Sequence, residues 1–168
     1  MRRATTIIPK GNERLIETQG FNSITLTREE RYRRRIACKS DEGDTFLLDL
    51  AEATYLTDGS GLELDDGSIV IVRAASEDLL KVTAPDSATL MRIAWHIGNR
   101  HTPAEVTTQA IYIQPDHVLA DMVRGLGGTA IQIARPFEPE GGAYGGHGSL
   151  EHGHHHGGKH HHHSHDHA

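Results

Sequence analysis

Two stretches between residues 85 and 126 repeat apolar positions with the spacing of an amphipathic helix. In the first, the apolar positions follow the i, i+3, i+4, i+7 pattern: Leu90, Ile93, Ala94 and Ile97. Asp86 supplies an N-cap, and the pair Gly98 and Asn99 tolerates the left-handed backbone that often ends a helix. The pattern therefore predicts a helix after Asp86 with a turn following Asn99.

The second stretch has the same organisation. Its apolar positions are Val118, Leu119, Met122, Val123 and Leu126. Asp116 precedes them as an N-cap, and two glycines at 127 and 128 follow as a stop. His117 is therefore expected in the first turn of this helix.

Shorter apolar runs separated by turn residues fill the first half of the chain. They predict strands at residues 6–8, 23–26, 34–38, 45–50 and 69–73. Turn chemistry occurs at 41–43, 58–59 and 65–67. This half is expected to be a small β-domain.

The second half alternates strands with the two helices. The predicted order is a strand at 79–82, the first helix, strands at 105–107 and 110–113, the second helix, and a strand at 130–134. This βαββαβ order predicts an α+β fold of ferredoxin-like arrangement, with both helices on one face of an antiparallel sheet. Residues 74–77 are small and polar, so we place a boundary there. The predicted division is a β-rich domain at 1–74, a metal-binding domain at 75–144 and a disordered tail at 145–168.

Composition narrows the functional classes. The formal net charge is −6, which argues against nucleic acid as the main partner. Cys38 is the single cysteine, so a disulfide framework and a multi-cysteine zinc site are excluded. No apolar run has the length of a membrane span, and no signal peptide follows Met1. A soluble, cytoplasmic protein is expected.

Three histidines flank the two helices. His101 is held between a helix stop and Pro103, which leaves it little freedom to lose on binding a ligand. His96 and His117 are also candidate metal ligands. The alternative for His96, which lies beside Trp95, is a partly buried structural residue, and the alternative for His117 is an ordinary exposed residue. A four-coordinate metal needs further ligands, so the economical arrangement is a homodimer with two His101 residues at its axis.

Eleven of the 14 histidines lie between residues 147 and 167, among glycines and serines. These candidate metal ligands are His147, His152, His154, His155, His156, His160, His161, His162, His163, His165 and His167. The segment lacks apolar mass and periodicity and is expected to be disordered without metal. A purification tag is the alternative interpretation, but the histidines are dispersed and the pure run covers only 160–163.

Four stretches together carry a resemblance to a known family. His-Ile-Gly-Asn-Arg-His at 96–101, Asp-His-Val-Leu-Ala-Asp-Met at 116–122, Pro-Phe-Glu-Pro-Glu-Gly-Gly-Ala-Tyr at 136–144 and the histidine-rich tail resemble the UreE family of urease accessory metallochaperones. The resemblance implies a homodimer that carries Ni(II) on His101 of each subunit with help from the tail. It also implies delivery to apo-urease, within an accessory complex, through a GTPase partner. Where some members have a further ligand histidine, this chain has Pro115.

Imidazole suits nickel, copper and zinc, so the choice of nickel rests on the resemblance, and Zn(II) or Cu(II) can substitute in vitro. We expect the tail to capture Ni(II) and pass it to the paired His101 site. A further option is that metal joins two dimers into a tetramer. A histidine-rich nickel or zinc store without a delivery role is the alternative function. The chain lacks the zinc-protease motif, the phosphate-binding loop and the nucleophile elbow, so an enzyme ranks last.

Five arginines lie between residues 28 and 35. The interpretation we favour is a solvated strand face and loop. The alternative is a docking patch for an acidic protein surface, with Arg31, Arg33 and Arg35 as its candidate residues. The family resemblance implies a polypeptide partner for this domain.

Overall fold

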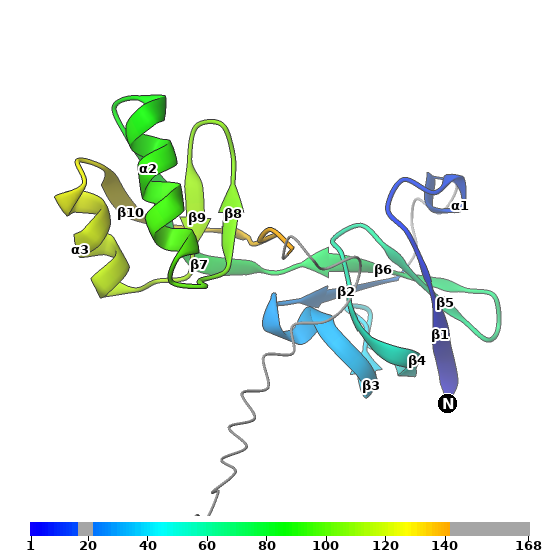
Figure 1. Cartoon of the computed structure of the whole chain (residues 1–168). Coiled ribbons are helices and arrows are strands. Elements are labelled where there is room, and N and C mark those ends of the chain that lie inside the picture. Colours follow the sequence, from blue (N-terminus) through cyan, green and yellow to red (C-terminus); the bar gives the residue numbers. More distant parts are fainter. Residues whose placement is uncertain (17–21, 142–168) are drawn as a thin grey trace, which may run out of the picture.

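Two β-sheets organise the computed structural model, which describes residues 1–16 and 22–141 (Figure 1). The predicted disorder of the tail concerns residues outside this range. The described residues form a mixed α/β fold with few helices. Each sheet has its own hydrophobic core, so the two halves of the chain bury their apolar residues separately.

The first half forms a six-stranded mixed sheet in the order β2-β6-β5-β1-β4-β3. Its elements are β1 (Arg2–Ile8), α1 (Glu13–Ile16), β2 (Ser23–Leu26), η1 (Glu29–Arg31), β3 (Tyr32–Lys39), β4 (Thr45–Tyr55), β5 (Gly61–Leu64) and β6 (Ile69–Ala74). The pairs β1/β4 and β2/β6 are parallel, and the remaining pairs are antiparallel. Phe46, Leu48, Leu62 and Val72 are among the fully buried residues of its core.

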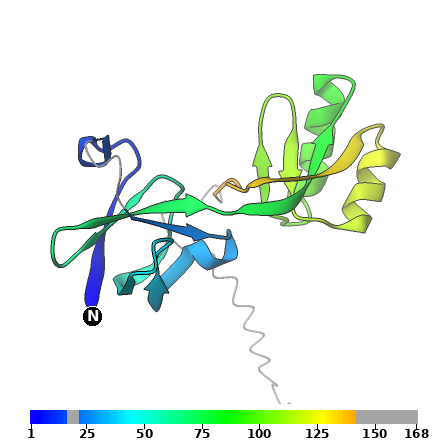
Figure 2. The same ribbon diagram turned by 180° about the vertical axis from the view of Figure 1, so that it is seen from behind.

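The second half forms an antiparallel sheet in the order β10-β7-β9-β8. Its elements are β7 (Ser76–Thr83), α2 (Ser87–Gly98), β8 (Ala104–Val106), β9 (Ile111–Ile113), α3 (His117–Gly125) and β10 (Thr129–Pro136). Both helices pack on the same core as the sheet, through Ile93 and Ile97 of α2 and Leu119 and Val123 of α3. Figures 1 and 2 show α2 and α3 side by side in this half.

The strands predicted from alternation are present, and so are both predicted helices. Three elements of the first half were not predicted: α1, η1 and β5. Each spans no more than four residues, which is too short for a periodic signal. Strand β4 also extends to Tyr55, beyond the predicted end at residue 50.

The chain passes from one sheet to the other at Ala75, the single residue between β6 and β7. The predicted boundary falls at this passage, and the division into domains stays a prediction. Hydrogen bonds also link the two halves of the chain at this passage. Arg31 donates hydrogen bonds to the carboxylate of Glu138 and to the carbonyl of Phe137, and the amide of Arg28 donates to the carboxylate of Glu77 at 2.7 Å. These contacts tie the start of β7 and the residues just after β10 to the first half.

Candidate metal centre

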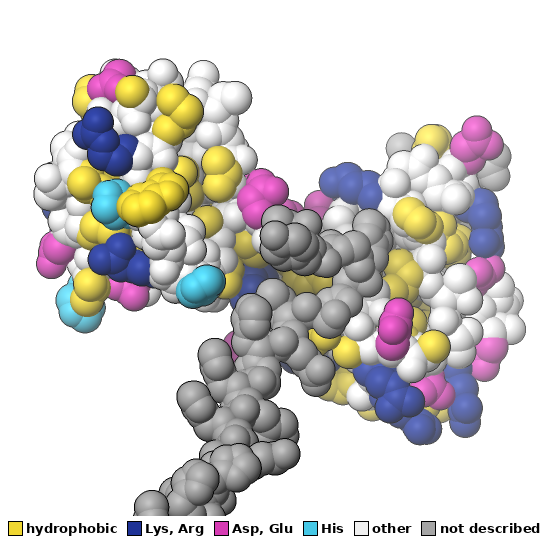
Figure 3. Space-filling model, viewed as in Figure 1, with side chains coloured by type: hydrophobic (Ala, Val, Ile, Leu, Met, Phe, Trp, Pro, Cys, Tyr) yellow, Lys and Arg dark blue, Asp and Glu magenta, His cyan; other side chains and the backbone are white. Residues whose placement is uncertain are grey.

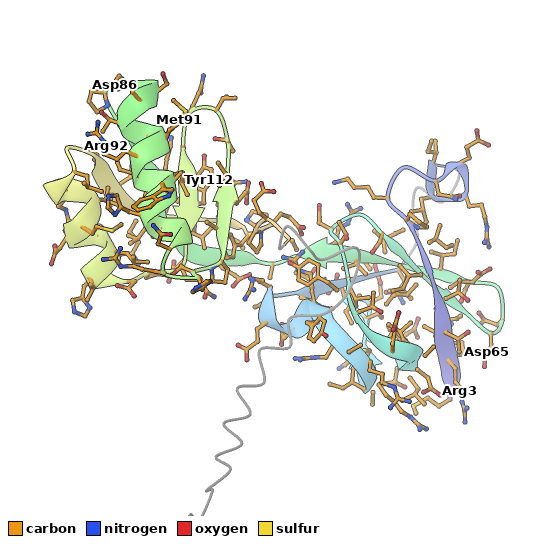
Figure 4. The ribbon with its side chains drawn as sticks, viewed as in Figure 1. Arg3, Asp65, Asp86, Met91, Arg92 and Tyr112 are labelled. Atoms are coloured by element: carbon orange, nitrogen blue, oxygen red, sulfur yellow. The ribbon has the colours of Figure 1, made fainter. Side chains whose placement is uncertain are left out.

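Helix α2 starts at an aspartate cap and ends at the turn that carries His101. The carboxylate of Asp86 accepts hydrogen bonds from the amide and the hydroxyl of Thr89, both at 2.8 Å. Donation by the Thr89 amide is the main reason that the pKa of Asp86 is lowered. Asp86 lies at the far end of the helix in Figure 4, so the cap and the histidine turn mark its two ends.

The turn places His101 in a left-handed conformation. The amides of Arg100 and His101 donate to the carbonyls of Ile97 and Gly98, each at 3.0 Å. His101 has φ of 53° and is the only non-glycine residue with positive φ among those the structure describes. Asn99 remains in the right-handed region with φ of −64°. The left-handed residue that was expected at Gly98 or Asn99 is therefore the histidine itself, a residue type enriched in this region.

The side chain of His101 is exposed. Strand β8 begins three residues later at Ala104, and its Glu105 accepts a hydrogen bond from Arg135 of β10 at 2.7 Å. The Cζ atom of Arg135 also lies 4.0 Å from the centre of the Tyr112 ring. Tyr112, labelled in Figure 4, belongs to β9, the strand between β7 and β8 in the sheet. These contacts anchor β8, the strand that follows the His101 turn. That His101 is held between the helix stop and Pro103 stays a prediction.

Arg100 links the turn to α3. Its guanidinium donates to the carbonyl of His96 at 3.2 Å and contacts the sulfur of Met122 at 2.9 Å. A cation at the C-terminal end of α2 is also favourable because the last carbonyls of a helix lack partners. This arginine was not singled out from the sequence, because nothing in the spacing indicates that it reaches the second helix.

His96 and His117 have different surroundings. His96 is half-buried, and its ring lies edge-on to that of Trp95, with centroids 5.0 Å apart and an interplanar angle of 82°. His117 is exposed as the first residue of α3, whose cap Asp116 accepts from the amide of Leu119 at 2.9 Å.

The described part of a single chain does not assemble these histidines into a site. Within residues 1–16 and 22–141, no group of three or more histidine, cysteine, aspartate or glutamate side chains is placed to hold a metal ion. Figure 3 shows the described histidines as separate patches on one face of the second half. The tail histidines, from His147 to His167, lie outside the described residues.

Residues that precede the tail in the chain are hydrogen-bonded to β8. The amide of Glu140 donates to the carbonyl of Ala104 at 2.8 Å, and the amide of Glu138 donates to Glu105 at 3.0 Å. Glu140 is therefore bonded to Ala104, which lies three positions after His101 in the chain. Residue 141, which follows Glu140, is the last residue that the structure describes.

The arginine candidates separate into buried and exposed residues. Arg31 is completely buried against Glu138 and Tyr55, so burial removes it from any surface that a partner contacts. The side chain of Arg35 is 59% exposed and pairs with Asp49 at 3.4 Å. Arg33 is half-buried on the same strand. Among the described helices, none has the length and apolar character needed to cross a bilayer.

The fold and the histidine positions define an α/β protein that presents imidazole groups at its surface. Two family models match almost the whole chain: "UreE urease accessory protein, N-terminal domain" at residues 4–75 and "UreE urease accessory protein, C-terminal domain" at residues 77–167. The chain belongs to the UreE family of urease accessory proteins.

Individual relatives agree with this assignment. The chain is 47% identical over 154 residues to the urease accessory protein UreE of Chelativorans sp., a match covering 92% of this chain and 94% of the relative. It is 50% identical to UreE of Rhodopseudomonas palustris and 51% identical to that of Azorhizobium caulinodans. Those matches cover 73% and 79% of this chain but only 57% and 63% of the relatives, which are longer.

Proposed function

We propose that this protein is a nickel metallochaperone that captures Ni(II) and delivers it to apo-urease during active-site assembly. Membership of the UreE family supports an accessory role rather than an enzymatic one. The observation that carries the proposal is the exposed His101, fixed at the end of α2 by hydrogen bonds on both sides of its turn. A preordered imidazole loses little entropy on binding a metal.

A second copy of the chain supplies the missing ligands in this proposal. Met91 and Trp95 lie one helical turn apart on α2 and are each 65% exposed, which is unusual for large apolar side chains. Figure 4 shows Met91 projecting from α2, the helix that precedes the His101 turn. Pairing of two such faces would cover these side chains and bring two His101 rings together at the axis, and metal would join dimers into tetramers.

The tail acts as the capture device. Its eleven histidines hold roughly two or three ions if each ion takes about four nitrogens. Flexible ligands lose more entropy on binding, so these sites exchange faster than the His101 site. Glu140, which precedes the tail in the chain, is hydrogen-bonded to Ala104, three positions after His101, and this supports transfer within one molecule. The participating histidines are His147, His152, His154, His155, His156, His160, His161, His162, His163, His165 and His167.

His117 is assigned to a second, weaker site because it is exposed at the start of α3. His96 is assigned a supporting role, since its half-buried ring packs against Trp95. Pro115 stands where some family members have another ligand, so the His117 site lacks that partner.

Delivery involves a urease accessory GTPase and the apo-urease complex, in the cytoplasm. Arg33 and Arg35 of β3 belong to the partner-binding surface, whereas the buried Arg31 supports it from within. The second half is assigned the ferredoxin-like arrangement, supported by its βαββαβ order and its antiparallel sheet with the first strand between the fourth and third.

A calorimetric nickel titration tests the proposal with four chains: intact, truncated after Tyr144, and the truncated chain with either His101→Ala or His117→Ala. We expect the truncated chain to keep about one tight ion per dimer, held by His101 of both subunits. His101→Ala should abolish that binding, and the matched His117→Ala control should retain it. Light scattering on the same samples reports the dimer.

The concentration of histidines in the tail favours one second candidate, a nickel or zinc store without specific delivery. It predicts that truncation removes all tight binding and that His101→Ala changes nothing in the intact chain. Either result would reject the carrier and support the store.

A further inference from the structure

The residues that follow β10 pass from one edge of the second sheet to the other. Strand β10 is one edge of this sheet and β8 is the opposite edge. β10 ends at Pro136, yet the amide of Glu140 donates a hydrogen bond to the carbonyl of Ala104 in β8 at 2.8 Å. Figures 1 and 2 show these residues, in orange, between the two halves of the chain. Residues 137–140 are called the crossing segment below.

The carboxylate of Glu105 joins the crossing segment to β8. It accepts a hydrogen bond from the amide of Glu138 at 3.0 Å and another from the guanidinium of Arg135 at 2.7 Å. Hydrogen bonds to a charged group are stronger than those between neutral groups, and the side chain of Glu105 is only 15% exposed. One carboxylate of β8 therefore binds both β10 and the segment that follows it.

The same segment is bonded to the first half of the chain. The carboxylate of Glu138 accepts hydrogen bonds from Arg31 and from the amide of Asp58, the latter at 3.3 Å, and Arg31 also donates to the carbonyl of Phe137. Arg31 and Phe137 are both completely buried. The backbone of Glu138 therefore bonds to the second half, while its side chain bonds to the first.

Strand β8 has little support of its own. It spans three residues and pairs with β9 alone among the strands that the structure describes. Segments with few contacts are the first to open in a folded protein. His101 precedes this strand by three positions and has φ of 53°, a conformation that persists in a non-glycine residue only where the surrounding structure maintains it. The bonds of Glu105 and Glu138 thus support the strand that follows a strained turn.

We propose that Glu105 and Glu138 are positioning residues for the metal site: they hold β8, and through it the His101 turn, and they link this turn to Arg31 in the first half. The inference rests on the proposed function, because it takes His101 as a nickel ligand. A partner that separates the crossing segment from Arg31 would loosen the turn and speed release of the ion. The first half thereby sets how long the second half retains its metal.

The test uses the full chain and the variants Glu105→Gln and Glu138→Gln, which keep the size of the side chain and remove its charge. The first measurement is amide hydrogen exchange of residues 99–106 without metal. We expect exchange to become faster by about tenfold or more in both variants, because a hydrogen bond to a charged group contributes roughly this factor. Glu105→Gln leaves the buried Arg31 paired with Glu138, so it remains informative if Glu138→Gln fails to fold.

The second measurement is nickel release to EDTA from the chain loaded with one ion per dimer. The slow phase of release is identified as the phase that His101→Ala removes. We expect it to become about tenfold faster in both variants, while the fast phase, from the tail, stays unchanged. The double variant should match the more affected single variant, because both carboxylates act through one segment, whereas independent losses of stability would add.

Gly61→Ala is the control for a general loss of stability. A Cβ atom at this position would lie 2.6 Å from the Cδ2 atom of Leu15 and 2.9 Å from the Cγ2 atom of Ile69. The substitution therefore disturbs packing in the first half without touching the crossing segment. It should lower the stability measured by urea unfolding and leave both the exchange of residues 99–106 and the slow phase unchanged.

Three results would overturn the inference alone: a normal slow phase that neither glutamine variant changes, additive effects in the double variant, or equal acceleration by Gly61→Ala. A parent chain without a slow phase that depends on His101 would overturn the proposed function and this inference with it. The two failures are therefore distinguishable in one set of samples.

Discussion

Arg31 and Glu138 lie 107 positions apart in the chain, and the guanidinium of the first donates a hydrogen bond to the carboxylate of the second where the two sheets meet. The side chain of Arg31 is completely buried, while that of Glu138 is 35% exposed. Arg31 also lies 5.0 Å from the centre of the Tyr55 ring, and burial is the main cause that raises the pKa of this tyrosine. The pair ties the residues that follow β10 to the first half of the chain.

Glu138→Ala should destabilise the protein by roughly 3 kcal/mol, because it leaves the buried guanidinium of Arg31 without its carboxylate. Urea unfolding followed by circular dichroism measures the change. Arg124→Ala is the matched control, since Arg124 pairs with Asp121 at 2.9 Å on an exposed helix surface. Its loss should be about 0.5 kcal/mol or less, and an equally small loss for Glu138→Ala would show that the junction pair does not stabilise the fold.

Gly128→Ala should destabilise the second half by about 1–3 kcal/mol through overpacking. A Cβ atom at this position would lie 2.6 Å from the Cδ1 atom of Ile93 and 2.9 Å from the Cγ1 atom of Val123. Gly125→Ala is the control because its Cβ meets nothing within 4 Å. It should be neutral or slightly stabilising. Thermal unfolding compares the two variants, and equal midpoints would contradict the packing of α2 and α3 around Gly128.

Asp86 should contribute to stability in a pH-dependent way. Its pKa is lowered in the folded state, chiefly by the hydrogen bond from the Thr89 amide, so its charged form is favoured by folding. The contribution is complete above the unfolded pKa of about 3.9 and is lost as pH falls through the lower folded value. The melting temperature of the parent should therefore exceed that of Asp86→Asn at pH 7, and the gap should close under strong acid. A gap that persists unchanged in strong acid would rule out this linkage.

Nickel binding should weaken between about pH 6.5 and 5, because imidazole coordinates metal only in its neutral form. Equilibrium dialysis of the intact and truncated chains across this interval measures the effect. The intact chain should lose more bound ions than the truncated one, since it contains more histidines. Unchanged nickel affinity over the interval would exclude histidine as the dominant ligand.

Local patterns were sufficient for the elements that surround the candidate site. The apolar stripes and aspartate caps predicted α2 and α3, and alternation predicted the strands that pair with them, because these signals depend on neighbours a few residues apart. The position of His101 in an exposed turn followed from the same local rules. The left-handed backbone of the histidine did not, since Gly98 and Asn99 tolerate that conformation more readily.

Sequence patterns could not find contacts between distant residues. Five arginines in one run looked like a solvated face, yet Arg31 is buried because its partners at Phe137 and Glu138 arrive from the end of the chain. The parallel pairings of β1 with β4 and of β2 with β6 likewise depend on sheet order, which joins strands that are far apart in sequence.

The sequence by itself determined the helices, the histidine turn, the acidic charge balance and the resemblance to the UreE family, because each is written in short-range spacing or in a motif. Tertiary structure alone decided which arginine is buried and which distant strands pair in the first sheet. Those features arise from pairings between residues up to 107 positions apart, and no local propensity specifies them.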